Sequence, residues 1–381
     1  MDEIKLSSCT ISDEIDIRRV SERPLALRND RYDEDFDWKT LFYDTYQCGR
    51  FTVFQGPPLN NLYSYLKEYS LFQNVSGFLM AKHKINQRHK ACDIWIRGRV
   101  KNDNISGPLG DFRLNIQPSG NHIFANKRVM LTLSKENNLE WIADWAEFYQ
   151  KVHGVEAILF YDNGSTSYTA EEIRRAILRK CPSLTVVVVV WPFKYGPQGG
   201  VSGGKDGNVA PWDSDFCQTG VLQHARFRFL QNAKSVLNCD IDELVVGEKS
   251  EQSIFEYTEK RLLGLSYFKG LWIGNATEKH MESGIRRHRD FNYFSSLENN
   301  SCPNKWCIVP KITNRHYHTW SVHGIKGMKP FFGKTDYFKY RHFKAISNGW
   351  KYDRLDESNR VEPSEKLLDR KLKNAFSSAD I

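Results

Sequence analysis

The central part of the chain alternates between strand-like apolar runs and amphipathic segments. Segments 128–134, 155–162 and 184–191 have strand composition, and the last, with its run of valines, is typical of a buried parallel strand. After the first segment, apolar residues recur three and four positions apart and so form one face of a helix. They are Leu139, Ile142, Trp145, Ala146 and Tyr149. A second helix is predicted at 170–181, and this alternation is the signature of a parallel sheet.

The pattern divides the chain into four parts. Residues 1–35 are polar and mixed in charge, which predicts a partly ordered arm. Residues 36–127 contain short β-like segments between turns rich in Gly, Pro and Asn, and they predict a small β-rich domain. Residues 128–352 contain the α/β alternation. Residues 353–381 predict a charged helical tail, which either packs on the protein or rests peripherally on an anionic membrane.

Composition narrows the possible functions. The chain has 381 residues and a net charge of +8, which favours anionic partners such as nucleotides. No predicted helix carries a dense stripe of Lys and Arg with aromatic neighbours, so a nucleic-acid partner is not expected. The eight cysteines lack zinc-ligand spacing, and with no signal peptide at the N-terminus they predict reduced thiols in a cytoplasmic protein. The longest apolar run is too short to cross a bilayer, so membrane contact would be peripheral, at the cytoplasmic face.

Acidic residues stand where two predicted strands end. Asp162 follows one strand, and Asp240, Asp242 and Glu243 follow another within "SVLNCDIDELVV". Ligands of open α/β sheets bind outside the carboxyl ends of the strands, so both clusters are expected at one crevice. In extended backbone Asp240 and Asp242 would project to the same side and share a divalent cation, with Glu243 directed elsewhere. A solvated turn is the alternative.

Longer motifs resemble a known enzyme family. The stretches "KENNLEWIADWAEFYQKVHGVEAILFYDNGST", "FCQTGVLQHARFRFLQNAKSVLNCDIDELVV", "NKWCIVPKITNRHYHTWSVHGI" and "YFKYRHFKAISNGWK" resemble, in order, blocks of GT-A type glycosyltransferases. The similarity is greatest to glycosyltransferase family 92 and its family-2-like branch, over about Val129 to Lys351. It implies a Rossmann-like α/β fold with a mixed, mostly parallel sheet flanked by helices, preceded by the small β-rich domain. The "HYHTW" segment and a long Gly-rich loop depart from the family pattern and leave the acceptor open.

The resemblance also implies a donor site. The donor would be a UDP-sugar, and Mn²⁺ or Mg²⁺ held by Asp240 and Asp242 would stabilise its departing diphosphate. The resemblance and the strand ends together place further residues beside the nucleotide or the diphosphate. These are Glu136, Asn137, Asp162, Asn163, Ser165, Asp240, Lys311 and Lys326. A turn or helix-cap role is the alternative for the loop residues, and simple solvation is the alternative for the lysines.

A third metal ligand, a base and an acceptor contact complete the expected site. The resemblance points to a C-terminal histidine as the ligand, with His318, His323 and His342 as candidates. For an inverting transfer, one carboxylate must take the proton of the attacking hydroxyl. Glu278, Glu282 and Asp290 are the candidates, although surface charge would also account for them. Trp272 either stacks on an acceptor sugar or belongs to the core.

These expectations describe a metal-dependent hexosyltransferase. It would move a hexose, by resemblance galactose, from a UDP-sugar to a hydroxyl of a glycan or lipid-linked glycan in surface polysaccharide synthesis. One alternative is a non-catalytic carbohydrate-binding or scaffold protein that retains the sheet, but the intact acidic motif and clustered histidines argue against it. Another is a metal-dependent phosphoesterase or nuclease, which the "DNGS" loop disfavours.

Overall fold

The structure, a computed structural model, describes most of the chain in two compact units. The described residues are 4–78, 82–101, 103–197, 213, 216–277, 286–313, 318–348 and 362–381. One unit comprises Met1–His122 and Pro192–Phe229, and the other comprises Ile123–Trp191 and Leu230–Ile381. The chain therefore leaves the first unit, builds part of the second, and returns once before completing it.

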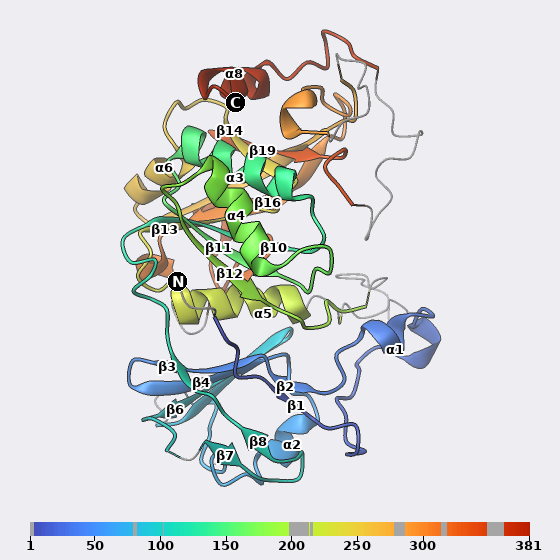
Figure 1. The fold of residues 1–381 in the computed structure, drawn as a ribbon, viewed down its shortest axis with the longest axis vertical. Coiled ribbons are helices and arrows are strands. Elements are labelled where there is room, and N and C mark those ends of the chain that lie inside the picture. Colours follow the sequence, from blue (N-terminus) through green and yellow to red (C-terminus); the bar gives the residue numbers. More distant parts are fainter. Residues whose placement is uncertain are drawn as a thin grey trace. The chain divides into compact units, whose positions relative to one another are not determined.

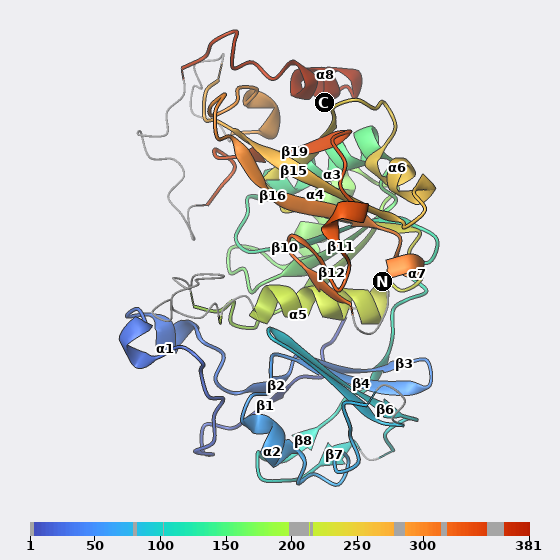
Figure 2. The same cartoon turned by 180° about the vertical axis from the view of Figure 1, so that it is seen from behind.

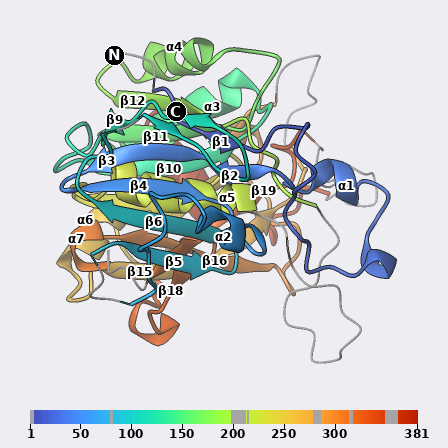
Figure 3. The ribbon, with the colours of Figure 1, turned by 90° about the horizontal axis from the view of Figure 1, so that it is seen from below.

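The first unit is built around a five-stranded sheet in the order β5-β6-β4-β3-β9, whose strands lie side by side in Figure 3. Their bounds are Lys84–Arg88, Ala91–Arg97, Phe51–Gly56, Asp44–Cys48 and Gln117–Pro118. The smaller elements are β1 Cys9–Thr10, α1 Tyr32–Asp35, β2 Thr40–Phe42, α2 Leu62–Leu66, β7 Asn104–Ile105 and β8 Phe112–Arg113. Helix α5, Phe216–His224, belongs to this unit and continues as a π-helical turn, Ala225–Phe229.

The second unit contains an eight-stranded sheet in the order β12-β11-β10-β13-β16-β15-β19-β14. In that order the strands are Thr185–Val190, Ala157–Asp162, Arg128–Ser134, Ser235–Asn238, Ser301–Ile308, Leu265–Ile273, Phe338–Phe343 and Glu243–Gly247. The pairs β12/β11, β11/β10, β10/β13 and β15/β19 are parallel, and the other three pairs are antiparallel. The predicted mixed, mostly parallel sheet flanked by helices is confirmed. The valine-rich strand β12 is parallel as expected but lies at the sheet edge.

Helices α3, Leu139–His153, and α4, Ala170–Lys180, lie over the strands β10, β11 and β12 (Figure 1). The Asn138 side chain caps the start of α3, and Gly154, with φ of 66°, ends it in the left-handed conformation that glycine adopts most easily. Thr169 and Glu172 form a capping box at α4. Both predicted helices are therefore confirmed close to their expected ends.

Further short elements complete this unit. They are α6 Ile254–Lys260, α7 Pro310–Thr313, β17 Thr319–Ser321, β18 Gly324–Lys326 and α8 Arg370–Ser378. The predicted tail helix is shorter than expected, and its Leu372 and Phe376 are buried. The opposite view shows β15 and β16 with α6 and α7 (Figure 2). Within the described part of the chain, no helix combines the length and apolarity needed to cross a membrane.

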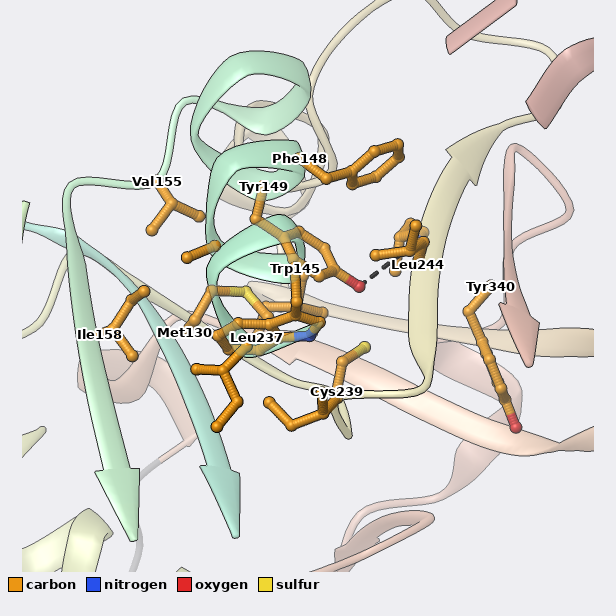
Figure 4. Packing of buried hydrophobic residues seen from close by; sticks show 14 of the residues in the cluster. Met130, Trp145, Phe148, Tyr149, Val155, Ile158, Leu237, Cys239, Leu244 and Tyr340 are labelled. Atoms are coloured by element: carbon orange, nitrogen blue, oxygen red, sulfur yellow. Dashed lines mark hydrogen bonds between the residues drawn. The ribbon is translucent and has the colours of Figure 1, made fainter. Parts of the chain in front are cut away.

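Packing under α3 fixes the part of the sheet where the acidic motif begins (Figure 4). Trp145 and Tyr149 are fully buried in the cluster that contains Leu237 and Leu244. The Tyr149 hydroxyl donates to the carbonyl of Glu243 at 3.0 Å and accepts from the amide of Val245 at 3.1 Å. The first residues of β14 are therefore held in place by helix α3, which precedes them by almost a hundred residues.

Candidate active site

The acidic motif lies in a turn between β13 and β14. The amide of Glu243 donates to the carbonyl of Asp240 at 3.1 Å, so the backbone folds back and is not extended as expected from the sequence. His288 Nε2 donates to the carbonyl of Ile241 at 2.8 Å, and the amide of Phe343 donates to the carbonyl of Asp242 at 2.9 Å. Each carbonyl of the turn is thus bonded, which orients the carboxylates.

The turn brings Asp242 and Glu243 together with His342. One donor atom from each of these three residues lies within 4.8 Å of the other two. His342 Nε2 lies 3.0 Å from Asp242 Oδ2, and Nδ1 lies 4.0 Å from Glu243 Oε1. Glu243 and His342 are direct partners of the antiparallel pair β14/β19, so strand register alone brings them face to face.

Trp272, on the neighbouring strand β15, lies on the other side of His342 from Glu243 in the strand pairing. It is the partner of His342 in the parallel pair β15/β19, and the two rings are stacked with centroids 4.0 Å apart and planes at 17°. Flat stacking restricts the imidazole to one plane, in which its Nε2 meets Asp242. Trp272 therefore positions the histidine in this structure.

A buried lysine balances part of the acidic charge. Lys305 Nζ lies 2.7 Å from Asp240 Oδ2 and 2.9 Å from Glu243 Oε2. Burial alone would lower the pKa of Lys305, but the two carboxylates outweigh this and raise it above its ordinary value. Burial raises the pKa of Glu243, and Lys305 opposes that shift. Lys305 therefore remains cationic and holds Asp240 and Glu243 in place.

The charge and donor types of this group suit a divalent cation. The carboxyl groups of Asp240, Asp242 and Glu243 outnumber the single ammonium of Lys305. Two carboxylates and an imidazole form a mixed oxygen and nitrogen set, which fits Mn²⁺ better than the all-oxygen preference of Mg²⁺. Asp242 is 19% exposed, so an ion could reach it. The residues present therefore fit the expected metal, although Asp240 faces Lys305 and Glu243 takes its place in the group.

The loops after β10 and β11 form a second polar cluster. The Ser165 hydroxyl donates to Asp162 Oδ1 at 2.5 Å and accepts from the amide of Glu136 at 2.8 Å. Burial raises the pKa of Asp162, and its hydrogen bonds with Ser165 oppose the shift. Hydrogen bonds from Ser167 and Thr166 lower the pKa of Glu136 to about 2. In this structure the Glu136 carboxylate therefore braces the 165–167 loop.

Both clusters lie at the carboxyl ends of parallel strands in one sheet. Asn137 Nδ2 donates to Ser134 Oγ, and Asn163 Nδ2 donates to the carbonyl of Trp191, each at 2.8 Å. Asn348 Nδ2 donates to the carbonyl of Lys135 at 2.8 Å. This last bond ties the loop after β10 to the segment that follows β19, the strand that carries His342.

Other predicted residues lie elsewhere or outside the described chain. Asp290 accepts from the amide of Arg287 at 2.7 Å and so caps a short 3₁₀ turn, His288–Asp290. The described residues bring neither His318, which is buried, nor His323, whose Nδ1 donates to the carbonyl of Asn304, into the Asp242 group. The lysines predicted at the diphosphate, Lys311 and Lys326, are exposed. The two remaining base candidates, Glu278 and Glu282, lie outside the described residues.

The sequence prediction assigned no role to Lys305 and directed Glu243 away from the ion. A signal for Lys305 was present, because a lysine inside the apolar strand segment "KWCIV" requires a carboxylate partner when it is buried. Which carboxylate it meets depends on the antiparallel pairing of β13 with β16, which no local pattern reveals.

Comparison with known proteins finds weak structural similarity to glycosyltransferases but does not identify a family for this chain. No protein-family profile matches the sequence, and no curated protein matches it either. Among solved structures, an active-site mutant of LgtC and the galactosyltransferase LgtC with donor and acceptor sugar analogs are each 17% identical, with TM-scores of 0.24 and 0.25. They cover 49% of this chain and 59% and 60% of their own chains. The mannosyltransferase Ktr4p from S. cerevisiae is 10% identical, with a TM-score of 0.22 and 39% coverage of each chain. These scores are too low to support an argument about function, and less than two thirds of each neighbour is spanned.

Proposed function

We propose that this protein is a metal-dependent glycosyltransferase that moves a hexose from a UDP-sugar to a hydroxyl of a glycan acceptor. The observation that carries the proposal is the Asp242, Glu243 and His342 group in the turn after the parallel strand β13, where the carboxyl groups outnumber the single ammonium of Lys305. A group of this kind suits a divalent cation and the diphosphate of a nucleotide-sugar. Galactose as the sugar, inversion and a role in surface polysaccharide synthesis rest on the motif resemblance, and a cytoplasmic location on the cysteine pattern.

The chain's own residues would divide the work between the two clusters. Asp242, Glu243 and His342 would hold the cation, which when bound stabilises the charge of the departing diphosphate as a Lewis acid. Lys305 keeps Glu243 oriented while that carboxylate is buried. Asp162, which is buried and accepts a hydrogen bond from the Ser165 hydroxyl, would exchange that bond for one from the ribose or base of the nucleoside.

The acceptor side rests on fewer observations. Glu278 and Glu282 remain the candidate bases, since Asp290 is used as a turn cap. Trp272 is half-buried and stacked on His342, so an acceptor sugar would meet the part of its ring that remains exposed. The acceptor is proposed to be a glycan or a lipid-linked glycan.

A thermal-shift experiment tests the proposal against its alternatives. The protein is melted with UDP, GDP or CMP, each with and without Mn²⁺. We expect a rise in melting temperature with UDP and Mn²⁺ together that exceeds the rises with either alone, because an ion held by Asp242, Glu243 and His342 would favour binding of the diphosphate to the folded protein. Asp242→Asn should remove the joint effect, whereas Asp336→Asn, at an exposed loop position, should keep it.

Three outcomes would contradict the proposal. Equal stabilisation by all three nucleotides, or by none, would remove the nucleotide-sugar assignment. Binding of UDP with Mn²⁺ but no transfer or hydrolysis of any UDP-hexose would favour the non-catalytic carbohydrate-binding alternative.

A further inference from the structure

Four large apolar side chains are exposed on three short segments of the second unit. Their exposed fractions are 93% for Leu262, 80% for Phe331, 55% for Phe332 and 40% for Ile312. Single exposed apolar residues are ordinary on protein surfaces, but a group of them marks an interaction site. Two consecutive phenylalanines in solvent are the most costly of these exposures.

Contacts between the three segments bring the four exposed side chains into one region of this unit. Arg261 Nη2 donates to the carbonyl of Phe332 at 3.1 Å, which joins the loop before Leu262 to the 3₁₀ turn Pro330–Phe332. The amide of Val309 donates to the carbonyl of Gly264 at 2.7 Å, and a Cβ at Gly264 would lie 2.8 Å from Ile312 Cδ1. We name the surface formed by Leu262, Ile312, Phe331 and Phe332 the apolar–basic surface.

The phenylalanine pair is presented by a loop that is fixed from behind. The amide of Tyr267 in β15 donates to the carbonyl of Gly333 at 2.7 Å, and the amide of Thr335 donates to the carbonyl of Tyr267 at 2.9 Å. A Cβ at Gly333 would approach the Tyr267 ring to 2.6 Å, so the loop packs tightly against the strand. The rings therefore face solvent because the backbone holds them there.

Basic residues border each apolar position. Lys260 and Arg261 precede Leu262, Lys311 precedes Ile312, and Lys329 and Lys334 flank the phenylalanine pair. All four lysines are exposed. Apolar side chains among cations match the boundary of an anionic bilayer, where the rings enter the headgroup region and the cations meet phosphates. The basic border is the charge complement of such lipids.

We propose that the apolar–basic surface binds peripherally to membranes that contain anionic lipids, with Phe331 and Phe332 inserted at the headgroup level. Its residues are not those of the Asp242 group, so the inference does not rest on the proposed function. It also differs from the tail contact expected from the sequence, because Leu372 and Phe376 of α8 face the core.

Vesicle co-sedimentation tests this inference. The full chain is mixed with vesicles of phosphatidylcholine alone, or with vesicles in which phosphatidylglycerol replaces part of it. We expect binding to the anionic vesicles that weakens with salt. The double variant Phe331→Ser/Phe332→Ser should bind at least about tenfold more weakly, because two apolar side chains no longer leave water. Lys329→Glu/Lys334→Glu should also lose about tenfold, since each cation near the surface contributes to attraction.

Matched variants separate this surface from general effects. Phe78→Ser replaces a phenylalanine that is 69% exposed on the first unit and should bind as the unmodified protein does. Lys366→Glu/Lys373→Glu changes two exposed lysines of the tail and should have little effect. The inference is overturned if the unmodified protein does not bind anionic vesicles, if the tail variant loses binding instead, or if ultracentrifugation shows a dimer that the phenylalanine double variant abolishes.

Discussion

Two groups in this protein are built from aspartate, histidine and a cationic side chain, yet they differ in charge balance and exposure. In the first unit, Asp44 is fully buried between His224 Nε2, at 2.8 Å, and the guanidinium of Arg228. In the second unit, Asp242 and His342 remain partly exposed beside Glu243. Residue type alone therefore does not distinguish a structural ion pair from a candidate site.

The difference lies in how completely each carboxylate is compensated. Asp44 Oδ1 also accepts from the amides of Ser7 and Thr45, each at 2.8 Å. Burial would raise the pKa of Asp44, but the His224 hydrogen bond and the Arg228 charge outweigh this and lower it. In the Asp242 group, the carboxyl groups of Asp240, Asp242 and Glu243 outnumber the single ammonium of Lys305. A buried carboxylate that has compensating partners is costly to remove, whereas carboxyl groups that outnumber their cationic partners near solvent can bind a cation.

The largest effect is expected from Asp44→Ala. The change leaves Arg228 buried without its carboxylate, which costs about 3–5 kcal/mol of stability. Urea denaturation should show an earlier transition for the first unit, with Asp111→Asn, at an exposed position of the same unit, unchanged. An unaltered transition would show that the Asp44 group is not structural.

Asp242→Asn should affect activity and not stability. Removing one charged ligand is expected to reduce UDP-hexose turnover at least about a hundredfold, as for other groups that stabilise developing charge. The melting temperature without metal should stay the same or rise, because one of several neighbouring negative charges is removed. A large loss of stability without loss of turnover per folded molecule would show that Asp242 has a structural role, like Asp44, and not a catalytic one.

His153 extends the comparison to an imidazole buried without a carboxylate. Its Nε2 donates to the carbonyl of Val245 at 2.8 Å, and burial lowers its pKa to about 4. The unfolded chain takes up this proton near pH ~6.5. Stability present above that pH is therefore lost as the pH falls toward the folded pKa, by about 2 kcal/mol at pH ~5.

The variant His153→Gln isolates this contribution. Glutamine does not titrate, so its unfolding free energy should decrease less between neutral and mildly acidic pH than that of the unmodified protein. Parallel pH profiles for the two proteins would mean that His153 is not the group that titrates.

The smallest effect is expected from Trp272→Ala. Loss of the stack frees the His342 ring, which should weaken Mn²⁺ binding by about 1 kcal/mol. Calorimetric titration of Mn²⁺ measures this directly, and Trp272→Phe should recover most of the affinity. Unchanged Mn²⁺ affinity in the alanine variant would leave Trp272 with an acceptor or packing role only.

Local sequence patterns were sufficient to predict the strands and helices of the parallel half of the sheet. The strands β10, β11 and β12 and the helices α3 and α4 follow their predicted segments, because periodicity and end signals such as Gly154 act within one or two turns of chain. The position of the acidic motif along the chain was also predictable, because its acidic residues directly follow an apolar strand segment.

The membership of the candidate site was decided by strands that are far apart in the sequence. His342 meets Glu243 through the β14/β19 pairing, Trp272 meets His342 through β15/β19, and Lys305 arrives on β16. Each contact depends on strand order and register, which follow from burial across the whole sheet. The sequence by itself therefore determined which elements form and where the acidic turn stands. The tertiary structure decided that Lys305 neutralises Asp240 and that Glu243 joins Asp242, because charges compensate one another through space and not along the chain.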